Sequence, residues 1–292
     1  MSDSWHIGII GGSGLYADIG LQDAQQIAVS SPFGAPSGPV TLGTLDGVRF
    51  SFLPRHGEGH ALPPAQVNYR ANIDVLKRCG VTDLLTVSAV GSLRDDLAPG
   101  HFVAVDQFID RTHGRERSFF GKDTVAHVGL ADPVCPRLAA LAADAAHKAG
   151  VAGVHRGGCY IAIEGPQFST RAESNLYRQW GADVIGMTAM PEARLAREAE
   201  LPYAVLAMVT DYDCWRESGE SVDAAGVFAV MGENVAFARE ALRHFAASLP
   251  PERPASPIDR TLDTAFANTD ELGPRLMAAG LDAVAGRLLK QG

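Results

Sequence analysis

The chain has 292 residues, of which 46% are hydrophobic and 20% are charged, so it can bury a large core and its composition excludes wholesale disorder. A formal net charge of -9 at pH 7 argues against a nucleic-acid partner, which selects a basic surface. The four cysteines form no C-x-x-C pair, which disfavours a zinc site or a disulfide framework and predicts reduced thiols in a cytoplasmic protein.

The chain shows no export signal and no apolar run that is long enough to cross a bilayer, so we expect no membrane partner. The first predicted element is a buried strand from His6 to Ile10, which ends in a turn of sequence GGSGL. Backbone N–H groups and the Ser13 hydroxyl of this turn can bind an anion. Its glycine spacing matches neither the dinucleotide fingerprint nor the Walker motif, and a tight structural turn is the alternative.

A hairpin and a histidine-containing loop come next. Two β-rich runs between Val40 and Leu53 flank an Asp-Gly pair, which predicts a hairpin. In the loop that follows, Arg55 offers a planar fork for phosphate and His56 a further hydrogen bond. His56 and His60 are four residues apart, but the glycines between them make the helix of a metal site improbable, and a solvated loop is the alternative.

The rest of the sequence predicts alternating helices and strands. The expected helices are Ala65–Cys79, Pro136–Lys148, Arg171–Trp180, Pro191–Glu200 and Val222–Phe245. The expected strands are Thr82–Val90, Phe102–Ile109, Tyr160–Ile163, Ala182–Ile185 and Tyr203–Val209. This alternation predicts an α/β fold with a central mixed sheet flanked by helices, as a single domain over residues 1–292 with a helical tail at 258–292.

Several polar segments are expected at strand ends. Ser88-Ala89, Glu164-Gly165-Pro166 and Thr210-Asp211 each follow or end a predicted strand, as the glycine-rich turn does. Ligands of open α/β sheets bind beyond the carboxyl ends of the strands, so these segments are expected to converge on one site.

The segment after Glu164 contains an aromatic ring and a helix start. Phe168 can stack on a flat base, although a core position is the alternative. Thr170 and Glu173 have the spacing of a capping box for the helix that follows.

Two carboxylates follow the strand that begins at Tyr203. Burial and like charge both raise the pKa of a carboxyl group, so either Asp211 or Asp213 can stay protonated and donate while its partner accepts. The edge of an adenine requires this combination, because N7 needs a donor and the 6-amino group needs an acceptor. An N-cap or a surface turn is the alternative.

Seven runs of the chain, read together, resemble the trimeric purine nucleoside phosphorylase family, and most closely its members that cleave methylthioadenosine. The runs are GIIGGSGL, SPFGAPS, PRHGEGH, VSAVGSL, IEGPQFSTRAES, GADVIGMTAMPEA and MVTDYDCW. They extend in the family's order from Ile7 to Trp215, over nearly three quarters of the chain.

The resemblance implies a partly barrel-like mixed sheet, a homotrimer, and no metal or organic cofactor, with inorganic phosphate as a co-substrate. Phosphate would be bound by Ser13, Arg55, His56, Ser88, Ala89 and Thr188. The nucleoside would be bound by Phe168, Met187, Asp211 and Asp213, with Asp211 as the catalytic group at N7. Specificity would come from Ser169, Ala224 and His127, the last reaching the site of a neighbouring subunit.

The implied reaction is phosphorolysis of S-methyl-5′-thioadenosine to adenine and 5-methylthioribose 1-phosphate, in purine and methionine salvage. Gly186 leaves base preference open, because relatives that act on methylthioinosine also carry glycine before the Met-Thr pair, whereas the two aspartates favour adenine. The alternatives within the family are therefore a methylthioinosine or a general purine nucleoside phosphorylase. The further alternatives are a hydrolytic nucleosidase, a non-catalytic nucleoside-binding protein, and an NAD-dependent oxidoreductase, which the glycine spacing disfavours.

Overall fold

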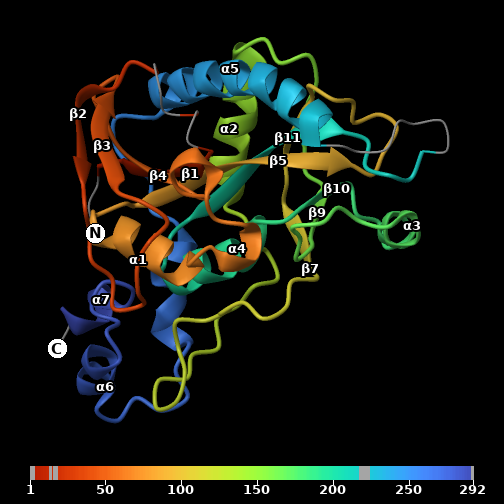
Figure 1. Ribbon diagram of the computed structural model, residues 1–292. Coiled ribbons are helices and arrows are strands. Elements are labelled where there is room, and N and C mark those ends of the chain that lie inside the picture. Colours follow the sequence, from red (N-terminus) through yellow and green to blue (C-terminus); the bar gives the residue numbers. More distant parts are fainter. Residues whose placement is uncertain (1–3, 13–14, 16–18, 217–223, 291–292) are drawn as a thin grey trace.

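The computed structural model describes residues 4–12, 15, 19–216 and 224–290, apart from the side chains of residues 224, 225 and 228. Within these ranges eleven strands form one mixed sheet with helices on both faces, which confirms the predicted α/β fold (Figure 1). The strands are β1 (His6–Gly11), β2 (Gln22–Ile27), β3 (Val40–Leu45), β4 (Val48–Pro54), β5 (Asp83–Ser92), β6 (Phe102–Ala104), β7 (Gln107–Asp110), β8 (Val154–Arg156), β9 (Cys159–Ala162), β10 (Val184–Gly186) and β11 (Tyr203–Asp211).

The helices form two layers and a tail. They are α1 (Tyr69–Arg78), α2 (Pro136–Lys148), α3 (Arg171–Gln179), α4 (Ala189–Glu198), α5 (Ala224–Ser248), α6 (Leu272–Ala278) and α7 (Gly286–Leu289), with short 3-10 helices at Glu58–His60, Pro64–Gln66 and Pro257–Thr264. α2 and α5 pack together on one face of the sheet, and α1 and α4 pack on the other (Figure 1). None of the helices in the described ranges is both long and apolar enough to cross a membrane.

The central strand β5 changes its neighbour along its length. On one side it pairs throughout with β11. On the other side it pairs with β1 as far as Thr86, and with β10, in the opposite direction, from Gly91. The edge of β5 between these two pairings is therefore left for other contacts.

Helix boundaries follow local signals. The helix predicted from Ala65 begins only at Tyr69, because the Asn68 side chain accepts a hydrogen bond from the Ala71 N–H at 3.1 Å and caps it. It ends before Gly80, whose φ of +87° is the left-handed conformation that favours glycine after a helix. The predicted capping box of α3 is confirmed, since Thr170 and Glu173 exchange hydrogen bonds.

Several predicted boundaries were wrong. The single strand expected at 102–109 is two strands, because β6 pairs with β11 and β8 whereas β7 pairs with β9. The predicted strand at Thr82–Val90 continues to Ser92, which places Ser88 and Ala89 within β5 rather than at its end. Two strands, β2 and β8, were missed because they are short and carry mostly polar residues. The predicted start of the long helix, Val222, lies outside the described residues.

The C-terminal tail packs against the α1 and α4 layer. Leu276, Leu281 and Val284 are buried in the same hydrophobic cluster as these helices. Asp282 pairs with Arg78 at 2.7 Å, and Arg287 pairs with the buried Glu200 at 2.6 Å. The tail therefore packs against the rest of the chain through apolar side chains and ion pairs. The interpretation of residues 1–292 as a single domain stays a prediction.

A buried ion-pair network connects the tail to the start of β5. The Arg253 side chain is 4% exposed and binds Asp83 and Asp259, the latter at 2.7 Å. A second guanidinium, that of Arg137, also reaches Asp83 at 2.6 Å. Removing one partner of a buried pair leaves the other charge poorly compensated.

We predict that Arg253→Met lowers the free energy of unfolding by about 3 kcal/mol, because Asp259 is left buried without its guanidinium. Urea denaturation monitored by circular dichroism measures the change. The control is Glu252→Gln at the exposed neighbouring position, which should leave the midpoint unchanged. Equal midpoints for both variants would contradict the importance of this network.

Candidate active site

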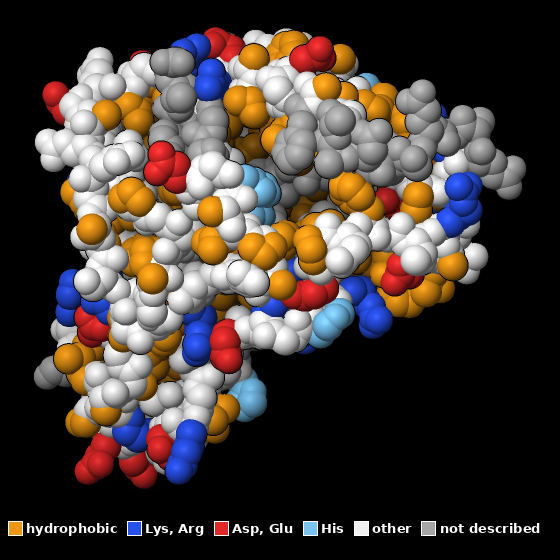
Figure 2. All heavy atoms as spheres, in the orientation of Figure 1, with side chains coloured by type: hydrophobic (Ala, Val, Ile, Leu, Met, Phe, Trp, Pro, Cys, Tyr) orange, Lys and Arg blue, Asp and Glu red, His pale blue; other side chains and the backbone are white. Residues whose placement is uncertain are grey.

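One cavity of about 710 Å³ opens beside the exposed edge of β5. Its walls come from segments that are far apart in the sequence, and both Arg55 and Asp211 line it. Figure 2 shows the hollow near the middle of the molecular face, with histidine and hydrophobic side chains around it. The expected convergence of the polar segments is therefore observed in this structure.

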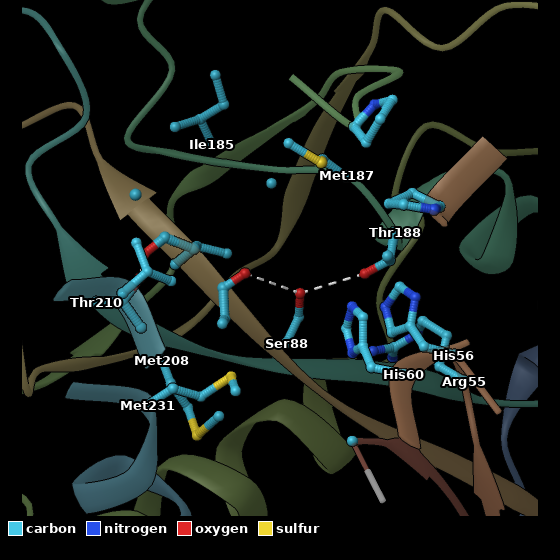
Figure 3. Close-up of a pocket in the computed structure, with 18 of the residues that line it drawn as sticks. Arg55, His56, His60, Ser88, Ile185, Met187, Thr188, Met208, Thr210 and Met231 are labelled. Atoms are coloured by element: carbon cyan, nitrogen blue, oxygen red, sulfur yellow. Dashed lines mark hydrogen bonds between the residues drawn. The ribbon is translucent and has the colours of Figure 1, made fainter. Parts of the chain in front are cut away.

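The β5 edge supplies hydroxyl groups. The Ser88 Oγ donates to the Ala89 carbonyl at 3.2 Å and lies 3.3 Å from the Thr188 Oγ (Figure 3). Thr188 follows β10, so its hydroxyl meets Ser88 where β1 has left β5 and β10 has not yet joined it. The two hydroxyls can rotate to donate to one ligand.

Tyr160, which the sequence analysis did not identify, lies behind the Ser88 and Thr188 hydroxyls. Its hydroxyl lies 3.4 Å from the Ser88 Oγ and accepts from the Thr188 N–H at 3.4 Å. A Cβ at Gly186 would overlap the Tyr160 hydroxyl, so this position has no room for a side chain. The glycine at 186 is thus explained by the packing of Tyr160.

Arg55 lines the cavity as expected, but its fork faces inward. Nε donates to Glu192 at 3.1 Å, and Nη2 reaches the other Glu192 oxygen at 3.4 Å. Nη1 donates to the Val87 carbonyl at 3.0 Å and Nη2 to the Ile10 carbonyl at 3.2 Å. In this structure the fork therefore binds Glu192 and two carbonyls of the strand edges, and the expected contact of Arg55 with phosphate stays a prediction.

The role of Glu192 is visible in the structure but not in the sequence. Its side chain is 1% exposed and also accepts from the Tyr203 hydroxyl at 3.0 Å. A carboxylate this deep requires a cationic partner, and Arg55 supplies it. The pair is formed between residues 137 positions apart, so no local pattern predicts it.

His56 is a half-buried, neutral imidazole. Its Nδ1 lies 2.9 Å from the Leu62 carbonyl, which can only accept, so Nδ1 carries the proton. Burial, and next the Arg55 charge, lower the pKa of His56 to about 4. The ring stacks on His60 at 4.2 Å between centroids, and both line the cavity (Figure 3). The expected donation from the imidazole goes to Leu62, which leaves Nε2 as an acceptor.

The two aspartates line the cavity further along β5, where Asp211 pairs with Gly91. Asp211 accepts from the Thr210 hydroxyl at 2.8 Å and from the Asp213 N–H at 2.7 Å. Burial raises the pKa of both carboxyl groups, and for Asp213 the Asp211 charge adds to this effect. The two carboxyl groups therefore lie together as predicted, Asp213 buried and Asp211 half-buried, and both hold a proton more readily than an exposed aspartate does.

An aromatic ring and a polar atom lie near these carboxyls. Phe168 lines the cavity and is 45% exposed, which excludes the alternative of a core position. The Ser169 Oγ is buried and has no hydrogen-bond partner within the described part of the chain. Met187 and Ile163 complete this side of the cavity.

The remaining wall is apolar and was not predicted. Helix α5 contributes Val227, Met231 and Val235, and Met208 of β11 lies beside them (Figure 3). The long helix was expected from its periodicity, but which of its residues face a cavity depends on how it packs over β11.

Three predicted site residues are not placed in the cavity. Ser13 lies outside the described residues, and so does the side chain of Ala224 at the start of α5. His127 is exposed, and its N–H donates to the Ala265 carbonyl at 2.8 Å. Its role in a neighbouring subunit stays a prediction.

The cavity thus combines hydroxyl donors at one end with raised-pKa carboxyls at the other. Such a site can bind an oxyanion and a polar heterocycle at once, and the apolar α5 wall suits an uncharged substituent. Among the described residues, no three His, Cys, Asp or Glu side chains gather as a metal site.

Comparison with known proteins gives concordant matches. Residues 6–249 match the pattern of the Phosphorylase superfamily. The chain is 55% identical over 286 residues to the S-methyl-5′-thioadenosine phosphorylase of Cereibacter sphaeroides, covering 97% of this chain and 98% of that protein.

Solved structures agree with this similarity. A methylthioadenosine phosphorylase from an antarctic soil metagenomic library is 44% identical, with a TM-score of 0.88 over 95% of this chain and 99% of that chain. The methylthioadenosine phosphorylase of Schistosoma mansoni in complex with adenine is 36% identical, with a TM-score of 0.79 over 96% of this chain and 100% of that one.

We predict that the His56 imidazole titrates near pH 4 in the ligand-free protein. Between this value and about 6.5 the unfolded chain binds the proton and the folded chain does not, so stability falls as pH decreases through this window. Nuclear magnetic resonance titration, assigned with His56→Asn, measures the pKa. A His56 signal that titrates near 6.5 would contradict the buried geometry.

Proposed function

Because the chain belongs to the phosphorylase superfamily, we propose that it splits S-methyl-5′-thioadenosine with inorganic phosphate into adenine and 5-methylthioribose 1-phosphate. It is then a pentosyltransferase, as its curated relatives are by name. The observation that carries the proposal is one cavity with oxyanion donors and two raised-pKa carboxyls on its walls.

The phosphate end is assigned to the edge of β5. Ser88 and Thr188 offer hydroxyl donors, and Arg55 has one Nη1 hydrogen beyond its contacts with the described residues. Arg55 also keeps a positive charge near the site, although Glu192 compensates it. Ser13 and the Ala89 backbone are further proposed contacts, and the His56 Nε2 is proposed to accept from the protonated oxygen of phosphate. Inorganic phosphate is the co-substrate, without any cofactor.

The base end is assigned to the two aspartates. Protonated Asp211 donates to N7 of the purine, and Asp213 accepts from the 6-amino group, while Phe168 packs on the ring. Donation to N7 stabilises the base as it leaves, because negative charge develops on it. The S. mansoni relative has been solved in complex with adenine, which supports adenine as the base.

The reaction follows from these positions. As the base departs, the sugar gains oxocarbenium character, and phosphate on the opposite face neutralises this charge and attacks C1′. Positioning and electrostatic stabilisation supply the catalysis, without a covalent enzyme intermediate. Met187 and Thr188 would lie along the ribose and phosphate.

The 5′ substituent is assigned to the apolar wall of α5. Val227, Met231 and Met208 favour a methylthio group over a hydroxyl, which would lose its hydrogen bonds to water there. Ser169, Ala224 and His127 are proposed to adjust specificity, with His127 acting across a subunit boundary in a homotrimer. The enzyme is proposed to work in the cytoplasm, in purine and methionine salvage.

A 6-oxopurine substrate is the second candidate, and Gly186 is the observation that favours it. The structure explains this glycine without reference to the base, because the Tyr160 hydroxyl occupies the space that a side chain at position 186 would need. Gly186 is therefore compatible with either base, and the two carboxyls decide for adenine.

The substrate experiment measures base release from methylthioadenosine, methylthioinosine and inosine, with and without phosphate. We expect methylthioadenosine to be preferred by about 10²-fold or more in kcat/KM, because an unmatched hydrogen bond at the base is costly. Cleavage that needs no phosphate would indicate a hydrolase, and faster turnover of methylthioinosine would overturn the assignment of the aspartates. Specific binding of NAD in a titration would revive the oxidoreductase alternative.

We predict that Asp211→Asn lowers kcat by about 10²-fold or more with only a modest loss of phosphate binding, because the amide can donate a hydrogen bond to N7 but not a proton. Since the acid must be protonated, wild-type activity should fall as pH rises through its raised pKa. This limb of the pH–rate profile should be absent in the variant. Its persistence would contradict the role of Asp211.

The matched control for this experiment is Asp95→Asn. Asp95 is 72% exposed and pairs with Arg216 on the surface, so the same change in charge and size occurs outside the cavity. The control should keep the wild-type rate and pH profile.

A further inference from the structure

Arg115 is a buried arginine that the proposed reaction does not use. Its side chain is 2% exposed, and it lies in the segment that follows β7. A guanidinium this deep is costly unless its donors are satisfied. The acceptors that its N–H groups bind therefore indicate the role of Arg115.

Two of its nitrogens bind the segment that follows β9. Nε donates to both carboxylate oxygens of Glu164 at 3.1 Å. Nη2 donates to the Glu164 carbonyl at 2.8 Å and lies 3.5 Å from the Ile163 carbonyl. The Glu164 carboxylate is itself held by the His113 N–H at 2.8 Å. This segment continues into Pro166 and Phe168, which line the cavity.

The third nitrogen binds the segment that follows β10. Nη1 donates to the Met187 carbonyl at 2.7 Å and to the Met190 carbonyl at 2.9 Å. These carbonyls stand on either side of Thr188, the hydroxyl that meets Ser88. One guanidinium thus spans the wall assigned to the base and the wall assigned to ribose and phosphate.

The two segments are in direct contact beside Arg115. The Ile163 N–H donates to the Gly186 carbonyl at 2.9 Å. A Cβ at Gly165, where φ is +67°, would overlap the Met187 sulfur. Their separation is therefore set by close packing on one side and by Arg115 on the other.

A third wall is connected through Tyr69. Nη1 of Arg115 lies 3.0 Å from the Tyr69 hydroxyl, which donates to the Pro64 carbonyl at 3.0 Å. The guanidinium carbon is also 5.4 Å from the centre of the Tyr69 ring. Pro64 lines the cavity on the side of His56 and His60.

We propose that Arg115 is a positioning residue for the reaction, which fixes the wall that covers the base relative to the wall that holds the sugar and phosphate. The inference rests on the proposed function. Bond cleavage at C1′ requires both walls at a defined separation, and a misplacement of about 1 Å can cost about 10²-fold in rate. The planar fork carries five donors on three separate nitrogens, whereas a lysine ammonium has three donors on a single atom.

The test compares Arg115→Lys with a matched control, Arg253→Lys. The Arg253 side chain is 4% exposed, pairs with carboxylates and also reaches a backbone carbonyl, that of Thr82, but its partners lie outside the cavity. Both variants should lose thermal stability. Only Arg115→Lys should lower kcat, by about 10²-fold, with a change in KM for the nucleoside of less than about 10-fold.

Equilibrium binding of adenine, measured by calorimetry, is the readout that does not need turnover. We expect binding to weaken several-fold in Arg115→Lys, in line with the change in KM, and to stay unchanged in Arg253→Lys. If wild-type protein shows no phosphorolysis, the proposed function fails, while unequal adenine binding still supports a positioning role. Wild-type kinetics and adenine binding in Arg115→Lys, or equal losses in both variants, would overturn the inference.

Glu164→Gln keeps the test decisive if Arg115→Lys does not fold. The glutamine retains an acceptor for the His113 N–H but removes the charge opposite Arg115. We expect a fall in kcat of about 10-fold without an equal rise in the KM for phosphate. Unchanged kcat in this variant would overturn the proposal.

Discussion

The cavity depends on the change of partner along β5. Because β1 leaves this strand at Thr86 and β10 joins it only at Gly91, the sheet opens at its centre rather than at its rim. Arg55 satisfies the carbonyls of Ile10 and Val87 where the first pairing ends. The opening would otherwise leave buried polar groups unpaired, which is costly. The same interruption exposes Ser88 to a ligand.

The two ends of the cavity are electrostatically different. At the β5 end the buried cation Arg55 is compensated by Glu192, and His56 is neutral because burial lowers its pKa. Binding of an oxyanion there relies on hydroxyl and backbone donors as much as on net charge. At the other end burial raises the pKa of Asp211 and Asp213, which favours a proton donor. We therefore assign phosphate and base to opposite ends of the cavity.

The sequence predicted those features of the fold and of the site that depend on short patterns. Helix α2 has the predicted bounds, and the pair Asp211 and Asp213 was identified because two carboxylates follow an apolar strand. Glu192, Tyr160 and Arg115 were missed, because their roles come from contacts with residues far along the chain. The direction of the Arg55 fork was not predicted for the same reason, since its partner Glu192 is 137 positions away. Local sequence encodes which groups exist, whereas packing decides where their donors point.

The central claim is that one sugar lies between an oxyanion and an aminated base in this cavity. A crystal structure of the protein with phosphate and an unreactive analogue of methylthioadenosine tests it most directly. The account predicts phosphate on Ser88 and Thr188, the base against Phe168 with N7 at Asp211, and the methylthio group beside Met231. Phosphate or base bound in a separate crevice, or the base at the Ser88 end, would contradict it.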